Sequence, residues 1–430
     1  MRARVGLCIF IGLLTSRVEA FDFGVCTHLA LGRSNAEDVL ALMKGGGFDA
    51  LRDDMYWGAV ESERGAPRIP PKYAELRSAL ASAAKAGKGA MIVLSSGNRY
   101  YDDNGLPRSG EAVDAYAKYA GYVARELRPD VKRFEIWNEW NTGFGSKPRV
   151  HKGDARDYAK LLAKAAPAIH RANPDAQVIG GATSGVDFAW FRELIAADGL
   201  KSLDAVSVHS YTLFRLQQNP EGAVASLDKL RKLLRDADAG RDIPIYVTEI
   251  GWPTNRGKHG ISERDAAMYL TRFALLARTR PWIAGVYWYD LLDDGDDDKS
   301  AEQRFGLVRR NRLPKPAFAA ARAIAPLLRS AQTPRAYRLG GSYFVSGIDA
   351  SGSWAMGWAM RPDFLAWNGG STAEAAAPAE LAPLAAKLPV DGFPVLFRLV
   401  GGQWRAYPDW MGAGVPPAAP PYLRVTQEAA

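Results

Sequence analysis

The stretch FEIWNEWN, from Phe134 to Asn141, decides how the rest of the chain is interpreted. Its apolar start predicts a buried strand, and this strand ends in Asn138 and Glu139. A carboxyl group between Trp137 and Trp140 would be poorly solvated, which favours its neutral form and raises its pKa. A general acid needs such a neutral carboxyl group. The structural alternative is that Glu139 caps a following helix and that both tryptophans belong to the core.

A second stretch, IPIYVTEIGWPT at 243–254, has the same character. Its apolar run ends in Glu249, and Gly251 and Pro253 then break the strand. Two carboxylates at the ends of two separate apolar strands are the groups with which glycosidases work. The pair therefore favours a catalytic role over the structural alternative.

Short apolar strands alternate with longer helical patterns over residues 21–328. This alternation predicts repeated βα units, and eight strands close a (β/α)8 TIM barrel. An open doubly wound sheet is the alternative, but no glycine-rich phosphate loop follows the first strand. The predicted strands are Phe23–His28, Ala50–Asp53, Ala90–Ser95, Arg133–Asn138, Gln177–Gly181, Ala205–Tyr211, Ile243–Glu249 and Ala284–Tyr289. The predicted helices are Pro71–Ala86, Glu111–Leu127, Asp154–Ala172, Asp187–Ala197, Pro220–Asp236 and Ser262–Arg278.

The pattern changes after the helical segment that ends at Leu328. Short β-type pieces divided by Gly, Ser and Asp follow, and then an Ala- and Pro-rich stretch and a Pro-rich tail. Residues 335–430 are therefore predicted to form a small antiparallel, sandwich-like β domain that packs on the barrel. Its tryptophans are expected to serve in packing, with stacking on sugar rings as the alternative: Trp354, Trp358, Trp404 and Trp410.

The first twenty residues are typical of an export signal. Arg2 and Arg4 precede the apolar run 5–14, and small or modest side chains end at Ala20. Residues 1–20 are predicted to be a cleaved signal peptide, which implies a periplasmic or secreted protein. An uncleaved membrane anchor is the alternative, and no later segment has the length and apolarity of a membrane span.

The charge of the chain, its cysteines and its possible metal ligands limit the kinds of partner and cofactor that we expect. The formal charge is +8, but basic residues are scattered, so nucleic-acid binding is poorly supported and an anionic polysaccharide is allowed. Cys26 would be the one cysteine after cleavage, which leaves a buried thiol and no disulfide. The acidic loop 290–298 lacks the spacing of a calcium loop and the histidines lack metal-ligand spacing. We expect no metal, no cofactor, and a monomer.

In a parallel barrel the carboxyl ends of all strands meet on one face. The residues expected there are Arg52, Asn138, Glu139, His209, Tyr211, Glu249, Trp288 and Tyr289. Their order resembles clan A of the glycoside hydrolases, and within it family 39 and bacterial exopolysaccharide hydrolases of that type. The resemblance covers about 21–328 and rests on LRDDMYWGAVESERG (51–65), EIWNEWN (135–141), GGATSG (180–185), VSVHSYTL (206–213), YVTEIGWPT (246–254), VYWYDLLDDG (286–295) and EQRFGLV…PKPAF (302–318).

The resemblance implies a retaining double displacement with Glu139 as acid/base and Glu249 as nucleophile. A guanidinium group from Arg52 would keep the nucleophile ionised. Carboxyl groups about 5–5.5 Å apart would then give retention, because no water fits between them for direct attack. The structural alternative for Arg52 is a salt bridge in the core.

The resemblance also implies how the sugar is held. Asn138 would bind the sugar 2-hydroxyl, Trp288 would form the floor under the ring, and either Tyr211 or His209 would orient Glu249 or bind a hydroxyl. The structural alternatives are a core histidine at His209 and barrel packing by Trp288. Positions proposed for more distant sugar contacts are Trp57, Glu61, Trp252 and His28, and Tyr289 ends the last strand beside Trp288.

The sequence thus predicts a retaining glycosidase that acts on β-linked glycans, with endo cleavage of a bacterial exopolysaccharide implied by the resemblance. An exo-acting β-xylosidase or related β-glycosidase is the alternative of the same class. A non-catalytic carbohydrate-binding protein of polysaccharide export is the alternative of a different class. The presence of Glu139, Glu249, Arg52 and Asn138 together speaks against it, since binding alone does not need two carboxylates with an arginine.

Overall fold

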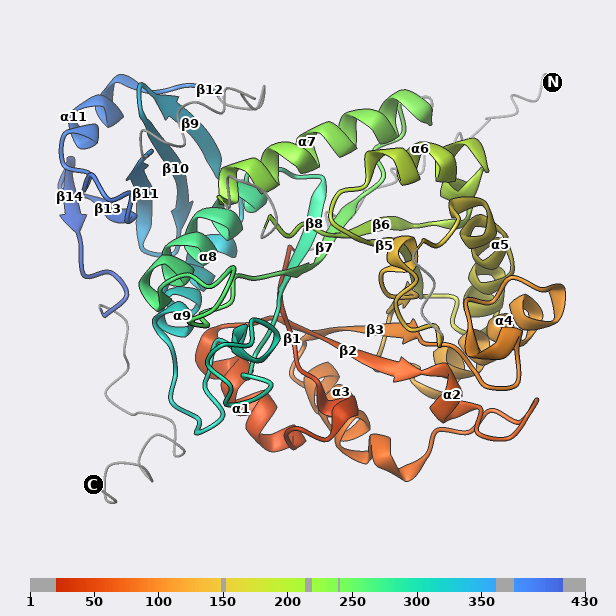
Figure 1. Ribbon diagram of the computed structural model, residues 1–430. Helices are drawn as coiled ribbons and strands as arrows, with labels where there is room; N and C mark the ends of the chain where they lie inside the picture. Colours follow the sequence, from red (N-terminus) through yellow and green to blue (C-terminus); the bar gives the residue numbers. More distant parts are fainter. Residues whose placement is uncertain (1–20, 148–151, 213–218, 239, 361–374, 413–430) are drawn as a thin grey trace, which may run out of the picture.

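The computed structural model describes residues 21–147, 152–212, 219–238, 240–360 and 375–412. Eight parallel strands close a barrel in the order β1 to β8 (Figure 1), which confirms the predicted (β/α)8 fold. The strands are β1 (Asp22–Cys26), β2 (Ala50–Tyr56), β3 (Gly89–Ser95), β4 (Arg133–Ile136), β5 (Gln177–Ser184), β6 (Ala205–His209), β7 (Ile245–Ile250) and β8 (Ile283–Trp288). The predicted strands match these to within a few residues at each end.

Helices surround the barrel, and polar side chains begin several of them. Ser262 accepts a hydrogen bond from the backbone N–H of Asp265 at 3.0 Å, and Asp154 and Asn219 cap their helices in the same way. All six predicted helices are present. The helices of the barrel are α1 (Ala36–Gly46), α2 (Trp57–Val60), α3 (Ala74–Lys85), α4 (Gly110–Glu126), α5 (Ala155–Ala172), α6 (Phe188–Ala196), α7 (Pro220–Ala237), α8 (Glu263–Arg278) and α9 (Pro316–Leu328).

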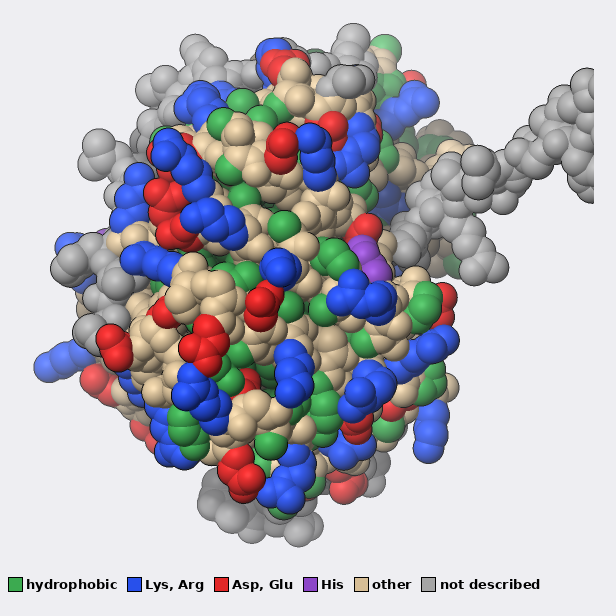
Figure 2. Space-filling model, turned by 90° about the vertical axis from the view of Figure 1, so that its right-hand side faces the viewer, with side chains coloured by type: hydrophobic (Ala, Val, Ile, Leu, Met, Phe, Trp, Pro, Cys, Tyr) green, Lys and Arg blue, Asp and Glu red, His purple; other side chains and the backbone are tan. Residues whose placement is uncertain are grey.

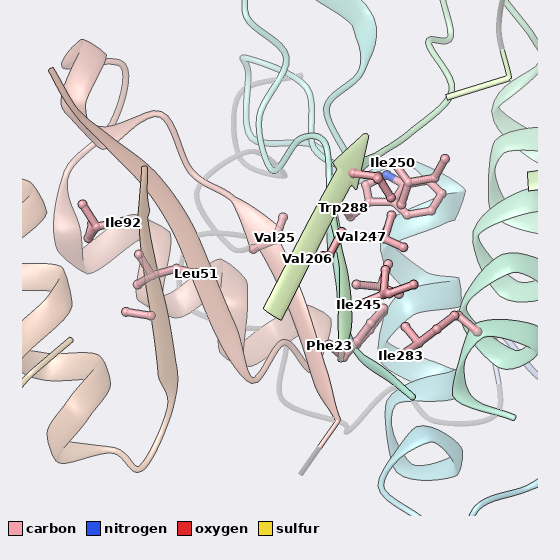
Figure 3. Packing of buried hydrophobic residues seen from close by; sticks show 14 of the residues in the cluster. Phe23, Val25, Leu51, Ile92, Val206, Ile245, Val247, Ile250, Ile283 and Trp288 are labelled. Carbon is pink, nitrogen blue, oxygen red and sulfur yellow. The ribbon is translucent and has the colours of Figure 1, made fainter. Parts of the chain in front are cut away.

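Side chains alternate between the two sides of each barrel strand, and this alternation positions the site. Along β2, Arg52, Asp54 and Tyr56 line a cavity at the top of the barrel, while Leu51 and Met55 pack outward in the core. Figure 3 shows the outward side of β7 and β8, where apolar side chains fill the space between these strands and the helices α8 and α9.

The predicted C-terminal β domain is present. Its strands form a six-stranded sheet in the order β12-β9-β10-β11-β13-β14, beside α7, α8 and α9 (Figure 1). Within the described residues this is one sheet, and no second sheet faces it as in a sandwich. The strands are β9 (Arg335–Leu339), β10 (Ser342–Asp349), β11 (Gly352–Ala359), β12 (Ala375–Ala376), β13 (Val395–Val400) and β14 (Gln403–Tyr407), and the short helix α11 spans Ala382–Ala385.

A buried ion pair joins the sheet to the barrel. Arg272 on α8 donates two hydrogen bonds, at 2.7 and 2.6 Å, to the carboxylate of Glu221 on α7. The indole N–H of Trp358 on β11 donates to the same carboxylate at 2.9 Å. Trp358, Trp354 and Trp410 are buried, as expected for tryptophans that pack. The β domain is therefore docked through polar groups that are withdrawn from water.

Replacement of Arg272 by methionine is expected to lower the free energy of unfolding by about 3–5 kcal/mol, because it leaves the Glu221 carboxylate buried without its cation. Urea denaturation followed by circular dichroism measures this loss. The control is Lys164→Met, which removes an exposed pair with Asp114 and should cost at most about 1 kcal/mol. Equal, small losses in both variants would contradict the role assigned to the buried pair.

Charges of both signs intermingle on the face of the molecule shown in Figure 2. Within the described parts of the chain, no helix is both long and apolar enough to cross a bilayer. The predicted signal peptide, residues 1–20, lies outside the described residues and stays a prediction.

Candidate active site

A cavity of about 590 Å³ opens at the carboxyl ends of the barrel strands. Most of the predicted site residues line it, and so do several residues that were not predicted. Its lining consists of Cys26, His28, Leu31, Arg33, Arg52, Asp54, Tyr56, Asn138, Glu139, Phe144, Ser184, Tyr211, Glu249, His259, Tyr289, Asp294, Ala301, Glu302 and Phe305.

Glu139, after β4, and Glu249, in β7, meet in this cavity. An oxygen of one carboxyl group lies within 4.8 Å of an oxygen of the other. Nδ1 of the buried His209 lies 3.1 Å from Oε1 of Glu139 and 3.5 Å from Oε2 of Glu249. The structure thus brings together two carboxyl groups that are 110 residues apart in the sequence.

The backbone after β4 turns sharply, and this turn delivers two consecutive side chains to the cavity. Trp137 and Glu139 have left-handed φ angles of 65° and 48°, which cost of order 1–3 kcal/mol each. The backbone N–H of Glu139 donates to the carbonyl of Ala182 on β5 at 2.8 Å. In a regular strand neighbouring side chains would point to opposite sides, whereas here Asn138 and Glu139 both line the cavity.

Arg52 holds the floor of the cavity together through hydrogen bonds to Cys26 Sγ, at 3.7 Å, and to three oxygen atoms. Its guanidinium donates to Glu135 and Glu249 at 2.8 Å each and to Oδ1 of Asn138 at 3.0 Å. Burial lowers the pKa of Arg52, but the charges of Glu135 and Glu249 outweigh burial and hold this pKa well above its ordinary value. Arg52 is therefore a permanent cation beside Glu249. Its guanidinium forms both a buried salt bridge with Glu135 and an ion pair with Glu249, and its predicted effect on Glu249 stays a prediction.

The sequence left open whether Tyr211 or His209 contacts Glu249, and the structure shows that both do. The hydroxyl of Tyr211 donates to Oε2 of Glu249 at 3.0 Å, while His209 contacts both glutamates. Burial lowers the pKa of His209, but the charge of Glu249 and the hydrogen bond with Glu139 outweigh it and raise this pKa. Burial and Glu249 raise the pKa of Tyr211, so its hydroxyl keeps the proton that it donates.

A barrel whose strand ends carry two adjacent carboxyl groups, an arginine and an amide is the arrangement of clan A glycosidases that the sequence resembles. The family model for glycosyl hydrolases family 39 matches residues 113–332, just over half of the chain. The chain belongs to glycosyl hydrolase family 39. It is therefore a glycosidase, with a carbohydrate as its substrate.

Solved structures show the same fold as this family 39 chain. A family 39 glycoside hydrolase from Bacteroides cellulosilyticus WH2 has 25% identity and a TM-score of 0.67, with 80% of this chain and 72% of that chain covered. The family 39 enzyme from Xanthomonas axonopodis pv. citri has 17% identity and a TM-score of 0.58, with coverage of 84% and 74%. A monomeric β-xylosidase from Caulobacter crescentus CB15 has 18% identity and a TM-score of 0.56, with coverage of 79% and 73%. No curated protein matches the chain.

Trp137 and Trp140, predicted to lie on either side of the Glu139 carboxyl group, do not line the cavity of this family 39 chain. Trp137 and Trp140 are fully buried and donate to the carbonyls of Phe144 and Asp154. The sharp turn sends their rings into the core while Glu139 enters the cavity. The expectation of an indole-lined cleft around Glu139 is therefore wrong.

Trp288 is also absent from the cavity lining, although it was expected under the sugar ring. Its side chain is on the outward side of β8, beside Ile250 and Val247 (Figure 3), with its ring centre 5.7 Å from that of Trp252. Because side chains alternate, the next residue, Tyr289, lines the cavity instead. Its hydroxyl donates to Oε1 of Glu302 at 2.7 Å.

Two more tryptophans expected at outer sugar positions are buried in this family 39 chain. Trp57 stacks on Tyr101 at 5.1 Å and donates to Glu61 at 2.6 Å, and Trp252 packs against Tyr269. Neither they nor Glu61 line the cavity. These three residues serve the core: Trp57, in α2, also stacks on Tyr119 of α4, and Tyr269 belongs to α8.

His28 lines the cavity as expected and belongs to an acidic cluster. Its Nδ1 lies 3.0 Å from Asp294 and 3.3 Å from Asp290. Burial is the main cause that raises the pKa of Asp290 to about 7. Within the described residues, two sets have ligand atoms close enough to share a metal ion: His28, Asp290 and Asp294, and Glu139, His209 and Glu249. In the first set the guanidinium of Arg33 already pairs with Asp294.

Proposed function

We propose that this glycosidase cleaves β-glycosidic bonds with retention of configuration, with Glu139 as acid/base and Glu249 as nucleophile. The observation that carries the proposal is the separation of at most 4.8 Å between an oxygen of Glu139 and an oxygen of Glu249. Retaining glycosidases have carboxyl groups about 5–5.5 Å apart, whereas inverting ones leave room for a water molecule.

The hydrogen bonds suit Glu249 to attack. Arg52 donates to Oε1 and Tyr211 to Oε2, so both oxygens are held and the negative charge has a fixed cation beside it. In the first step an oxygen of Glu249 bonds to the anomeric carbon. The bond to the leaving oxygen breaks as Glu139 gives that oxygen its proton.

Glu139 then serves as base in the second step. It takes a proton from water, the water oxygen bonds to the anomeric carbon, and the ester to Glu249 breaks. His209 contacts both glutamates and so holds them at a constant separation through both steps. Asn138 accepts from Arg52 through Oδ1, which leaves its NH₂ group to donate to the sugar 2-hydroxyl.

The substrate that we propose is a bacterial exopolysaccharide, cleaved within the chain by a secreted or periplasmic enzyme. Support for internal cleavage comes from the rim of the cavity, where Leu31 and Phe144 are each 45% exposed. Exposed apolar side chains there give contact area for sugar rings beyond the cleaved bond. Exo cleavage is the second candidate, since one solved structure with this fold is a β-xylosidase.

Mass spectrometry of the soluble products tests the proposal, with protein 21–430 and a panel of bacterial exopolysaccharides and plant β-glycans. Oligosaccharides from the wild type that are absent with Glu139→Gln and Glu249→Gln would support endo cleavage. Single sugars alone would favour exo cleavage. Glycan binding by all three proteins without any product would favour a non-catalytic carbohydrate-binding protein.

Retention itself is tested by proton NMR during the first minutes of hydrolysis. We expect the first product to carry the β-anomeric proton signal, with the α signal growing later by mutarotation, because two displacements restore the configuration. A first product with the α signal would contradict the assignment of Glu249 as nucleophile.

A further inference from the structure

The cavity is rich in acidic groups, although the whole chain has a formal charge of +8. Five carboxyl-bearing side chains and two arginines line it. Both arginines are already paired: Arg52 with Glu135 and Glu249, and Arg33 with Asp294. A carboxylate on the bound sugar would meet like charge there, with neither arginine free to neutralise it. The five carboxyl residues are Asp54, Glu139, Glu249, Asp294 and Glu302.

Asp54 is the acidic lining residue on the same strand as Arg52, and the proposed double displacement does not use it. It follows Arg52 by two residues on β2, on the same side of the strand and one pleat nearer the cavity mouth. The hydroxyl of Ser95 on β3 donates to Oδ1 of Asp54 at 2.9 Å and so fixes the carboxyl group. Among the described residues, Oδ2 of Asp54 makes no hydrogen bond.

Burial and the charge of Arg52 act on the carboxyl group of Asp54 in opposite directions. Burial raises its pKa to about 6, and the positive charge of Arg52 offsets only part of this effect. A fixed carboxylate with a free oxygen is a strong hydrogen-bond acceptor, and it suits the hydroxyl groups of a sugar ring. It repels a carboxylate at the same place.

We propose, on the basis of the function proposed above, that Asp54 binds hydroxyl groups of the sugar ring that is cleaved, and that this ring is a neutral sugar and not a uronic acid. Asp54 then determines specificity, while Glu139 and Glu249 carry out the bond exchange. The basic composition of the chain allows a polyanionic substrate. The acidic lining of the cavity disfavours one.

The identity of the cleaved ring can be measured directly, because hydrolysis turns the ring bound beside Glu249 into the new reducing end of the product. Reduction of the products with borodeuteride labels that ring alone, and mass spectrometry after acid hydrolysis identifies it. We expect a deuterated neutral alditol. A deuterated sugar acid would overturn this inference and leave the hydrolase function standing, whereas no product from any glycan would overturn both.

A pair of matched variants tests the role of Asp54. Asp54→Asn keeps the shape but removes the charge, and it is expected to lower kcat/KM by about 10- to 100-fold with an unchanged unfolding midpoint. The control is Asp296→Asn, which alters an 83% exposed side chain outside the lining and should change kcat/KM by less than about twofold. Equal activity of the two variants would overturn the assignment.

Discussion

Replacement of Glu249 by glycine is expected to lower kcat by about 10⁴- to 10⁶-fold, because the covalent step loses its nucleophile while the binding groups remain. The variant leaves a space at the position where Arg52 and Tyr211 donate their hydrogen bonds. A small anion such as azide fits this chemistry, since it can occupy the space and attack the anomeric carbon directly. We therefore expect azide to restore cleavage of activated aryl β-glycosides and to form an α-glycosyl azide.

The measurement for Glu249→Gly is the rate of aryl release with and without azide, followed by NMR of the product. Asp296→Gly serves as the control, because its side chain is exposed and lies outside the cavity lining. Residual activity above about one tenth of wild type would be incompatible with a covalent role. A β-glycosyl azide would point to the opposite division of roles between the two glutamates.

Replacement of Glu139 by alanine is expected to lower kcat on natural glycans by about 10²- to 10⁴-fold, since proton donation to the leaving oxygen is lost. The loss should be much smaller in the first step for dinitrophenyl glycosides, because their leaving group needs no proton. The glycosyl-enzyme ester on Glu249 should then accumulate as a burst of aryl release. Azide is expected to attack this ester from the β face and give a β-glycosyl azide.

Stopped-flow absorbance measures the burst, and intact-protein mass spectrometry measures the ester on Glu249. The opposite anomers expected from the Glu249 and Glu139 variants make each the control of the other. An equal loss for good and poor leaving groups, without a burst, would exclude Glu139 as the acid.

The sequence was sufficient to predict the central group of residues that meet in the cavity, but not the whole lining. Arg52, Asn138, Glu139, Tyr211 and Glu249 all line it, because the carboxyl ends of parallel strands converge whatever their sequence separation. The strand pattern is strong in this chain, since most barrel strands are short and largely apolar runs between helical segments. Convergence therefore followed from fold class alone.

The side of the strand from which a side chain projects was harder to predict. Trp288 and Tyr289 are neighbours, so their side chains project from opposite sides of the strand. An error of one residue at the end of β8 therefore assigns the wrong one of the two rings to the cavity. The left-handed turn at Trp137 and Glu139 likewise breaks the alternation on which such an assignment depends. No residue there is a glycine that would have signalled the turn.

Helix α1 and the buried ion pair of Glu135 were not predicted, because the sequence signal for each spans only a few residues. Helix α1 was not predicted, although Asn35 caps it and Gly47 ends it with a left-handed φ of 77°. Glu135 was treated as a strand residue, yet it is fully buried and pairs with Arg52. A charged residue inside an apolar strand requires a buried partner, and that requirement was the available signal.

The hydrogen bonds of Arg52 connect β2 with β4, with the segment after β4, and with β7. Those elements belong to the rigid barrel, whereas Leu31, Phe144 and Glu302 at the cavity rim belong to loops. The groups proposed for bond breaking and for the ring that is cleaved are therefore held by barrel strands or directly after one, whereas the proposed contacts to more distant sugar rings come from the connections between strands and helices. Exchange of these loops is expected to change the substrate without moving the reacting groups. Arg52 is the position that should be kept unchanged in directed evolution.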